Sequence, residues 1–294
     1  HQKPASVRGL LSPQGPQPLP FTVLSGTPGY INLLDALNAW QLVRELGQAT
    51  GLPAAASFKH VSPAGAAVYA PLSQDMLEVY EAAGKELSQT AIAYLRSRQA
   101  DPLCSFGDFV AISTTVDAST AALLKIEVSD GIIAPGYEPE ALEILRAKKG
   151  GKYIVLEADA AFEPPEEEAR TIFGTDFRQR RAADTITDAT LANVVTAKKE
   201  FSDAAKRDLL VAQVEIARCL ICTLAVAYAD ALFCSLLAWA HSPFAERHCV
   251  SLQVAIKYTQ SNSVGYAKDG QMVGVGAGQP VSYTHLRAHE TRHD

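Results

Sequence analysis

Residues 54–65 read AAASFKHVSPAG, and this stretch decides the fold. It begins with a short apolar run over residues 54–59, which predicts a buried strand. The run ends in the polar pair Lys59-His60, and the segment SPAG at residues 62–65 follows directly. The sequence therefore places a cation and an imidazole at the carboxyl end of a predicted strand.

Apolar runs alternate with amphipathic segments on both sides of this stretch. Further strands are predicted near residues 22–24, 109–113, 131–134 and 153–156. Helices are predicted over residues 33–50, with Asn32 as the cap, and over residues 74–96, 118–127 and 138–149. Strands that alternate with helices in this way are typical of an α/β fold.

The composition is that of a folded globular chain. Of the 294 residues, 48% are hydrophobic and 20% are charged, which excludes a disordered or fibrous protein. The net charge is −6 and no run is rich in Lys and Arg, so binding to nucleic-acid phosphates is not expected. We expect the partner to be a small molecule.

Four shorter patterns carry local predictions. Residues 1–20 contain five prolines and are predicted to form an extended, weakly ordered lead-in. The acidic residues 166–168 indicate a solvated helix start, and Asp269-Gly270 between alternating segments indicates a β-hairpin. Trp40 and Cys104 are assigned to the core.

Residues 214–253 differ from the rest of the chain. They hold four of the five cysteines, and residues 219–240 form an apolar run with a single charge that is long enough to cross a bilayer. The pair Cys219-x-x-Cys222 leaves open a zinc site with His241 and His248, or a redox function. The spacing of these residues departs from the usual zinc-finger pattern.

The Lys59-His60 pair is the first candidate for chemistry. Ligands of α/β sheets gather at the carboxyl ends of strands, so a base and a cation at this place suit acid-base catalysis. A structural histidine with satisfied hydrogen bonds is the competing interpretation, and the spacing alone does not decide between the two.

Five segments together resemble one known family: residues 57–65 (SFKHVSPAG), 29–43 (GYINLLDALNAWQLV), 105–112 (SFGDFVAI), 128–137 (VSDGIIAPGY) and 256–264 (IKYTQSNSV). They are similar to the formyltransferase part of the bifunctional purine-biosynthesis family, which joins AICAR formyltransferase to IMP cyclohydrolase. The resemblance implies a cytidine-deaminase-like three-layer α/β/α fold, here the first part of a duplicated formyltransferase domain. It also implies a cytosolic homodimer whose active sites are shared between two chains.

The reaction implied by the resemblance moves a formyl group from the co-substrate 10-formyltetrahydrofolate to the 5-amine of AICAR. His60 matches the catalytic histidine, which accepts the amine proton. Lys59 matches the lysine that stabilises the developing oxyanion or protonates the departing folate nitrogen, and Asn262 orients the substrate.

Four further residues match substrate-contacting positions of the family, namely Gly107, Asp130, Asn32 and Phe106. For Asn32 a helix cap, and for Phe106 a core aromatic, remain equal alternatives. No metal is expected, because the zinc signature of the deaminases is absent from the matched segments.

The resemblance divides the chain into a lead-in (residues 1–20), formyltransferase segments (21–213 and 254–280), an insert (214–253) and a tail (281–294). We interpret the insert as a retained in-frame intron and the tail as a translated sequencing-library adaptor.

The cyclohydrolase domain and the second half of the transferase are expected to lie outside the chain. We therefore expect this part to be inactive alone. The alternative is a non-catalytic binding or membrane-associated module in which the apolar segment at 219–240 is genuine.

Overall fold

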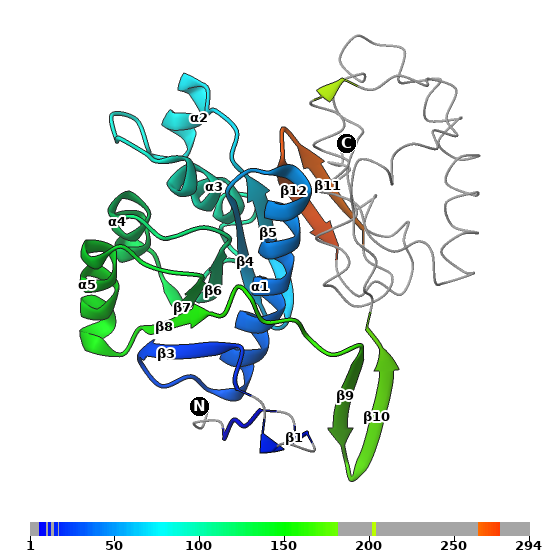
Figure 1. Ribbon diagram of the computed structural model, residues 1–294. Coiled ribbons are helices and arrows are strands. Elements are labelled where there is room, and N and C mark those ends of the chain that lie inside the picture. Colours follow the sequence, from blue (N-terminus) through cyan, green and yellow to red (C-terminus); the bar gives the residue numbers. More distant parts are fainter. Residues whose placement is uncertain are drawn as a thin grey trace, which may run out of the picture.

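The computed structural model describes residues 6–9, 11–12, 15–16, 18–181, 202–203 and 264–276. Within these residues, eight strands form one mixed sheet (Figure 1). In the order in which they lie across the sheet, the strands are β11 (Val264–Lys268), β12 (Gln271–Gly276), β5 (Ser62–Val68), β4 (Ala54–Lys59), β6 (Asp108–Ile112), β7 (Ser129–Ala134), β8 (Ile154–Ala158) and β3 (Phe21–Ser25).

Helices cover both faces of this sheet, so the described part has three layers (Figure 1). The long helix α1 (Tyr30–Thr50) covers one face, and α3 (Gln89–Arg98), α4 (Ala118–Ile126) and α5 (Pro139–Ala147) cover the other. Strand β4 shows why: Ala54, Ala56 and Phe58 face the α1 side, and Ala55 faces the opposite core. The predicted α/β class is confirmed.

Strand directions define the edge of the sheet on which the Lys59-His60 pair lies. Strand β4 is antiparallel to both of its neighbours, whereas β6, β7 and β8 are parallel to one another. The carboxyl end of β4 therefore lies beside the amino ends of those three strands. The pair does lie at the carboxyl end of a strand, β4, as expected. Ligands of α/β folds, however, usually bind at the carboxyl ends of the parallel strands, and the pair lies at the amino ends of β6, β7 and β8.

Helix α1 begins earlier than predicted. Gly29 is the N-cap residue, and the Asn32 side chain, in the first turn, accepts a hydrogen bond of 3.0 Å from the Gly29 N–H. Asn32 thus satisfies a free donor at the helix start from inside the helix rather than as the cap itself. The helix ends as predicted, at Thr50, and Gly51 caps it in the left-handed conformation.

The single helix predicted over residues 74–96 is wrong. The chain forms two helices there, the short α2 (Gln74–Val79) and α3, and each starts with a serine side chain that accepts a backbone N–H. Gly84 lies between them with φ +74°, a conformation that a continuing helix does not allow. The second serine, Ser88, then starts the new helix.

Strand β5 packs directly beneath α3, and Gly65 allows this close approach. A β-carbon added to Gly65 would lie 2.0 Å from the Ser97 carbonyl oxygen. The glycine of the SPAG segment is therefore explained by packing of a helix on a strand.

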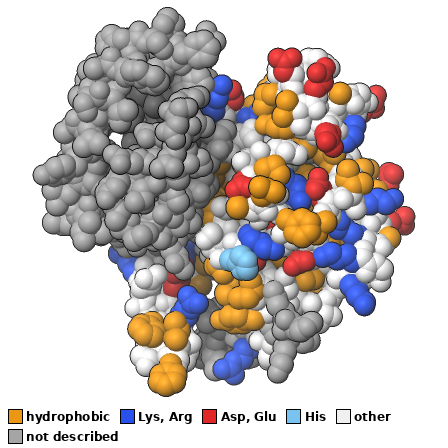
Figure 2. Space-filling view, turned by 180° about the vertical axis from the view of Figure 1, so that it is seen from behind, with side chains coloured by type: hydrophobic (Ala, Val, Ile, Leu, Met, Phe, Trp, Pro, Cys, Tyr) orange, Lys and Arg blue, Asp and Glu red, His pale blue; other side chains and the backbone are white. Residues whose placement is uncertain are grey.

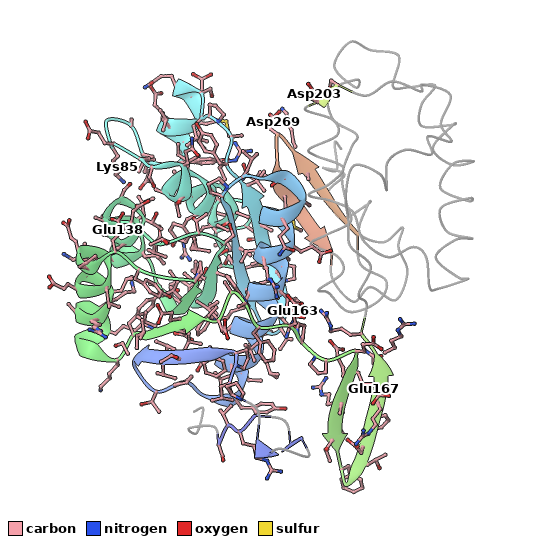
Figure 3. All side chains as sticks on the ribbon, in the orientation of Figure 1. Lys85, Glu138, Glu163, Glu167, Asp203 and Asp269 are labelled. Carbon is pink, nitrogen blue, oxygen red and sulfur yellow. The ribbon has the colours of Figure 1, made fainter. Side chains whose placement is uncertain are left out.

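The hairpin predicted around Asp269-Gly270 is confirmed as β11 and β12, with both turn residues at positive φ. Arg96 of α3, only 1% exposed, donates a hydrogen bond to the Asp269 carbonyl oxygen, and Asp269 is labelled in Figure 3. The Gly270 carbonyl accepts the Val68 N–H at 2.8 Å. These contacts join a segment distant in sequence to the edge of the sheet.

A β-hairpin at residues 167–180 lies outside the main sheet. Strands β9 (Glu167–Ile172) and β10 (Thr175–Arg180) form an exposed pair that projects from the body of the molecule (Figure 1). The helix start predicted at residues 166–168 is therefore wrong, because Phe173 and Gly174 adopt positive φ and turn the chain back as a hairpin. Just before this pair, Arg44 of α1 binds Glu163 at 2.5 Å (Figure 3).

In the described part of the proline-rich lead-in, β1 (Leu11–Ser12) and β2 (Gly15–Pro16) form a short antiparallel pair. Trp40 is buried as predicted, whereas Cys104 is exposed, so its assignment to the core is wrong. Among the residues that the structure describes, no helix has the length and apolar character needed to span a bilayer. The apolar run at 219–240, the cysteine pair within it and the tail lie outside the described residues.

Candidate functional site

The candidate site is built on the turn that joins β4 to β5. Lys59 pairs with Ser62, so His60 and Val61 are the two turn residues, with φ of +53° and +63°. Two-residue turns of this kind favour Asn and Gly, and a β-branched residue at positive φ is a rare outlier. Such conformations cost about 1–3 kcal/mol each and cluster at functional sites.

The Lys59 ammonium is held in place by two backbone carbonyls. Its Nζ atom donates hydrogen bonds to the Phe106 oxygen at 2.9 Å and to the Gly107 oxygen at 2.7 Å. Gly107 has φ +73°, and a β-carbon there would lie 2.8 Å from the same Nζ atom. Any other L-residue at this position would be strained by the positive φ, and its β-carbon would require the flexible end of the Lys59 side chain to shift.

The His60 side chain is exposed at the tip of the turn. Figure 2 shows a histidine on the surface of the molecule, beside a Lys or Arg side chain. Lys59 is half-buried, with its ammonium bound to two carbonyls, so the imidazole is the more exposed group of the pair. It is free to meet a ligand from solvent.

Asp35 belongs to this site, although the sequence analysis missed it. It lies in α1, is only 5% exposed, and its Oδ1 atom accepts the Val61 N–H at 2.5 Å. Burial raises the pKa of its carboxyl group, while the Val61 N–H and the charges of His60 and Lys59 act in the opposite direction. The available signal was a carboxylate in a stretch of the helix, LLDALNAW, that is apolar apart from Asn38.

Asp130 lies on the same edge, near the start of β7. Its carboxylate forms an ion pair of 2.8 Å with Lys149, and both side chains are partly exposed. Ser129, the residue before Asp130, pairs with Asp108 of β6, the residue after Gly107, so strand pairing places Asp130 next to this part of the site. The charge of Asp130 also raises the pKa of Asp35. The structure thus brings together Lys59, His60, Gly107 and Asp130 of the predicted site residues.

The remaining predicted residues have different outcomes. Phe106 is 64% exposed, so the core alternative is wrong, and its carbonyl oxygen binds Lys59. Asn32 is buried and occupied in capping α1, which supports the capping alternative. Asn262 lies outside the described residues.

Strand β11 starts two residues after Asn262. It is antiparallel to β12, which is antiparallel to β5, so β11 runs parallel to β5 and begins at the edge of the sheet where the β4–β5 turn lies.

A buried ion-pair network fixes the chain directly beneath the site. Asp108 follows Gly107, is fully buried, accepts a hydrogen bond from Ser57 at 2.6 Å and forms an ion pair of 3.2 Å with Arg98. Arg98 also binds Glu127 at 2.8 Å. Burial raises the pKa of Asp108, and Arg98 opposes that effect. The network was missed because its members lie far apart in sequence.

The arrangement offers an exposed base beside a fixed cation. The imidazole can accept a proton, the ammonium can stabilise negative charge that develops nearby, and the left-handed turn fixes the two side chains next to each other. In the described part of the chain, no three His, Cys, Asp or Glu side chains converge on a possible metal position.

Residues 1–231 match the family described as the AICARFT/IMPCHase bienzyme. A bifunctional purine biosynthesis protein PurH of Myxococcus xanthus (strain DK1622) is 34% identical over 171 residues, which cover 58% of this chain and 29% of the relative. The protein of the same name from Cereibacter sphaeroides (strain ATCC 17029 / ATH 2.4.9) is 30% identical over 250 residues, or 85% of this chain and 36% of the relative. The chain spans about a third of the length of these curated relatives.

Proposed function

Because the chain belongs to the AICARFT/IMPCHase bienzyme family, we propose that its Lys59-His60 turn carries formyl transfer from 10-formyltetrahydrofolate to the 5-amine of AICAR. The observation that carries the proposal is the turn itself, which holds an exposed imidazole next to an ammonium bound by two carbonyls. Family membership supports the inference that the chain takes part in purine biosynthesis.

His60 acts as the general base of the proposed reaction. The amine nitrogen of AICAR attacks the formyl carbon, and the imidazole accepts the proton that this nitrogen loses. The amine is a weak nucleophile because its lone pair is delocalised toward the carboxamide, so proton removal during attack lowers the barrier. The exposure of His60 supports this role, since the substrate approaches from solvent.

Lys59 acts on the folate side. Its ammonium stabilises the negative charge that develops on the formyl oxygen. When the bond from the formyl carbon to the folate nitrogen breaks, the same group supplies the proton that this nitrogen gains. The two hydrogen bonds to Phe106 and Gly107 leave the third N–H of the ammonium to be directed at the reacting group.

Substrate contacts are assigned to Asp130, Gly107, Phe106 and Asn32, and orientation of the reacting amine to Asn262. Asp130 is exposed enough to exchange its Lys149 partner for a substrate donor. The exposed ring of Phe106 offers a flat apolar surface for a base or a pteridine. The direction of β11 supports the assignment of Asn262, because this strand starts at the edge that carries the turn.

The same proposal extends to the organisation of the protein. We infer a cytidine-deaminase-like fold for the formyltransferase domain, active sites shared within a cytosolic homodimer, and an insert at residues 214–253 derived from a retained intron. Residues 214–253 correspond to 120 nucleotides, and sequencing of spliced transcripts tests whether these nucleotides are an intron. Spliced messages that lack them support the intron interpretation, and messages that all keep them contradict it.

Activity is tested in a chimera in which this chain replaces the segment that it matches in the Cereibacter sphaeroides relative. The chimera is made with and without residues 214–253. The form without the insert is expected to formylate AICAR, and His60→Ala to lower that rate by about 10²–10⁴-fold. Gln48→Ala, an exposed change in α1, is the control. An undiminished rate in His60→Ala would contradict the proposal.

A further inference from the structure

The β4–β5 turn adopts a conformation that one of its two residues, Val61, disfavours. His60 and Val61 both have positive φ, which histidine adopts more readily than most residues and which a β-branched valine rarely adopts. The residues of the turn therefore do not determine its shape by themselves. Contacts from elsewhere in the fold must hold it.

Asp35 supplies such a contact from another element. It lies in α1, and its Oδ1 atom accepts the N–H of Val61 at 2.5 Å, across 26 residues of sequence. The carboxylate is 5% exposed, and a buried carboxylate is unfavourable unless it is hydrogen-bonded. The hydrogen-bond partner of this buried carboxylate lies in the β4–β5 turn and not in α1.

We propose that Asp35 is a positioning residue, which holds the His60-Val61 turn in its left-handed shape and thereby aims the imidazole and the ammonium at one point. This inference rests on the formyl transfer proposed above. The turn is anchored at Lys59 by the Phe106 and Gly107 carbonyls and at Val61 by Asp35, and His60 lies between these two anchors. Its position is thus determined from both sides.

The consequence is kinetic. Groups that react must be held within a fraction of an ångström, and a displacement of 1 Å lowers a rate by about 10²-fold. Without the Asp35 acceptor, the turn is free to relax toward conformations that Val61 prefers. Substrate binding by other residues of the site changes little, so the loss falls on kcat and not on KM.

Two substitutions of Asp35 separate the hydrogen bond from the rest of the side chain. Asp35→Asn keeps an oxygen that can accept the Val61 N–H, whereas Asp35→Ala removes it. In the chimera, we expect Asp35→Ala to lower kcat by about 10–10²-fold with KM for AICAR within threefold, and Asp35→Asn to retain most of kcat. Equal losses in the two variants, or a loss confined to KM, would overturn the inference.

A second substitution in the turn keeps the inference testable if Asp35→Ala is poorly folded. Asn adopts positive φ readily, so Val61→Asn removes the need for the anchor. We expect the kcat of the double variant Asp35→Ala/Val61→Asn to be at least about tenfold higher than the kcat of Asp35→Ala alone. The effects of the two changes are therefore not additive, and strictly additive effects would contradict the inference.

A spectroscopic measurement on the chain itself needs no activity. A hydrogen bond of 2.5 Å to a carboxylate predicts a strongly downfield amide proton for Val61 and slow exchange with solvent. Asp35→Asn should move this resonance upfield, and an unshifted resonance would contradict the contact.

His60→Ala distinguishes the two proposals. If His60→Ala leaves formyl transfer intact, the proposed function fails. If His60→Ala lowers formyl transfer and Asp35→Ala does not, only the positioning role of Asp35 fails.

Discussion

Lys59 and Gly107 share one small space: the lysine Nζ donates a hydrogen bond of 2.7 Å to the glycine carbonyl, and a β-carbon on Gly107 would lie 2.8 Å from that nitrogen. The ammonium thus occupies space that a side chain at residue 107 would share with it. The strand ending at residue 59 and the loop before β6 are joined by this contact.

The first prediction concerns Gly107→Ala. The new methyl group displaces the Lys59 ammonium, and the positive φ adds roughly 1–2 kcal/mol of backbone strain. Gly84→Ala is a matched control, because Gly84 has φ +74° and nothing within 4 Å of an added β-carbon. We expect both to lower the free energy of unfolding similarly in urea titrations, and only Gly107→Ala to lower formyl transfer by tenfold or more. An equal loss of activity in both variants would contradict this.

The second prediction concerns the buried network under the site. Arg98→Met leaves the Asp108 carboxylate buried without its cationic partner, which lowers the free energy of unfolding by about 3–5 kcal/mol. Arg178→Met is the comparison, since Arg178 forms only exposed ion pairs with Glu167 and Asp176, and its loss should hardly change stability. Urea unfolding of the two variants measures the difference, and similar effects would show that the network is unimportant.

The third prediction concerns pH. The pKa of Asp35 is raised above its ordinary value of 3.8 by burial, so the folded state binds a proton there more tightly than the unfolded state. The stability that this group contributes is fully present below pH 3.8 and is lost as the pH rises through the folded-state pKa. Asp35→Asn removes this dependence.

Urea unfolding of the wild-type chain and of Asp35→Asn across this range is the measurement. The stability of the wild type relative to the variant should fall as the pH rises from below 3.8, and then become constant. A relative stability that rises with pH would mean that the hydrogen bond and the nearby cations outweigh burial.

The fourth prediction concerns the packing of α3 on β5. Gly65→Ala brings a methyl group into the Ser97 carbonyl and should destabilise the fold by about 1–3 kcal/mol or more. Gly136→Ala is the control, because its β-carbon would meet the Thr115 side chain at an ordinary 3.6 Å. Thermal unfolding compares them, and a Gly65→Ala variant as stable as the control would contradict this packing.

The sequence was sufficient to predict the strands whose residues are strongly apolar. Residues 109–113, 131–134 and 153–156 correspond to β6, β7 and β8, within one or two residues. Strand β5 was not predicted, because Ser62–Val68 consists of small residues and a proline that carry a weak strand signal. It forms because β4 and β12 pair with it on both sides.

The site was only partly predictable for a related reason. Lys59, His60, Gly107 and Asp35 all stand in segments that resemble a family, but the role of Asp35 depends on a single hydrogen bond to a residue 26 positions away. In a helix pattern, an isolated carboxylate looks like part of a solvated face. The Arg98–Asp108 pair, in the same way, is visible only when the chain has folded.

The rate of formyl transfer by the His60→Ala chimera, measured with and without added imidazole, tests the central claim most directly. The account predicts a rate lowered by at least about 10²-fold, and a partial recovery that grows with the imidazole concentration because the free base replaces the missing side chain. A variant that formylates AICAR as fast as the parent chimera, with no response to imidazole, would contradict it.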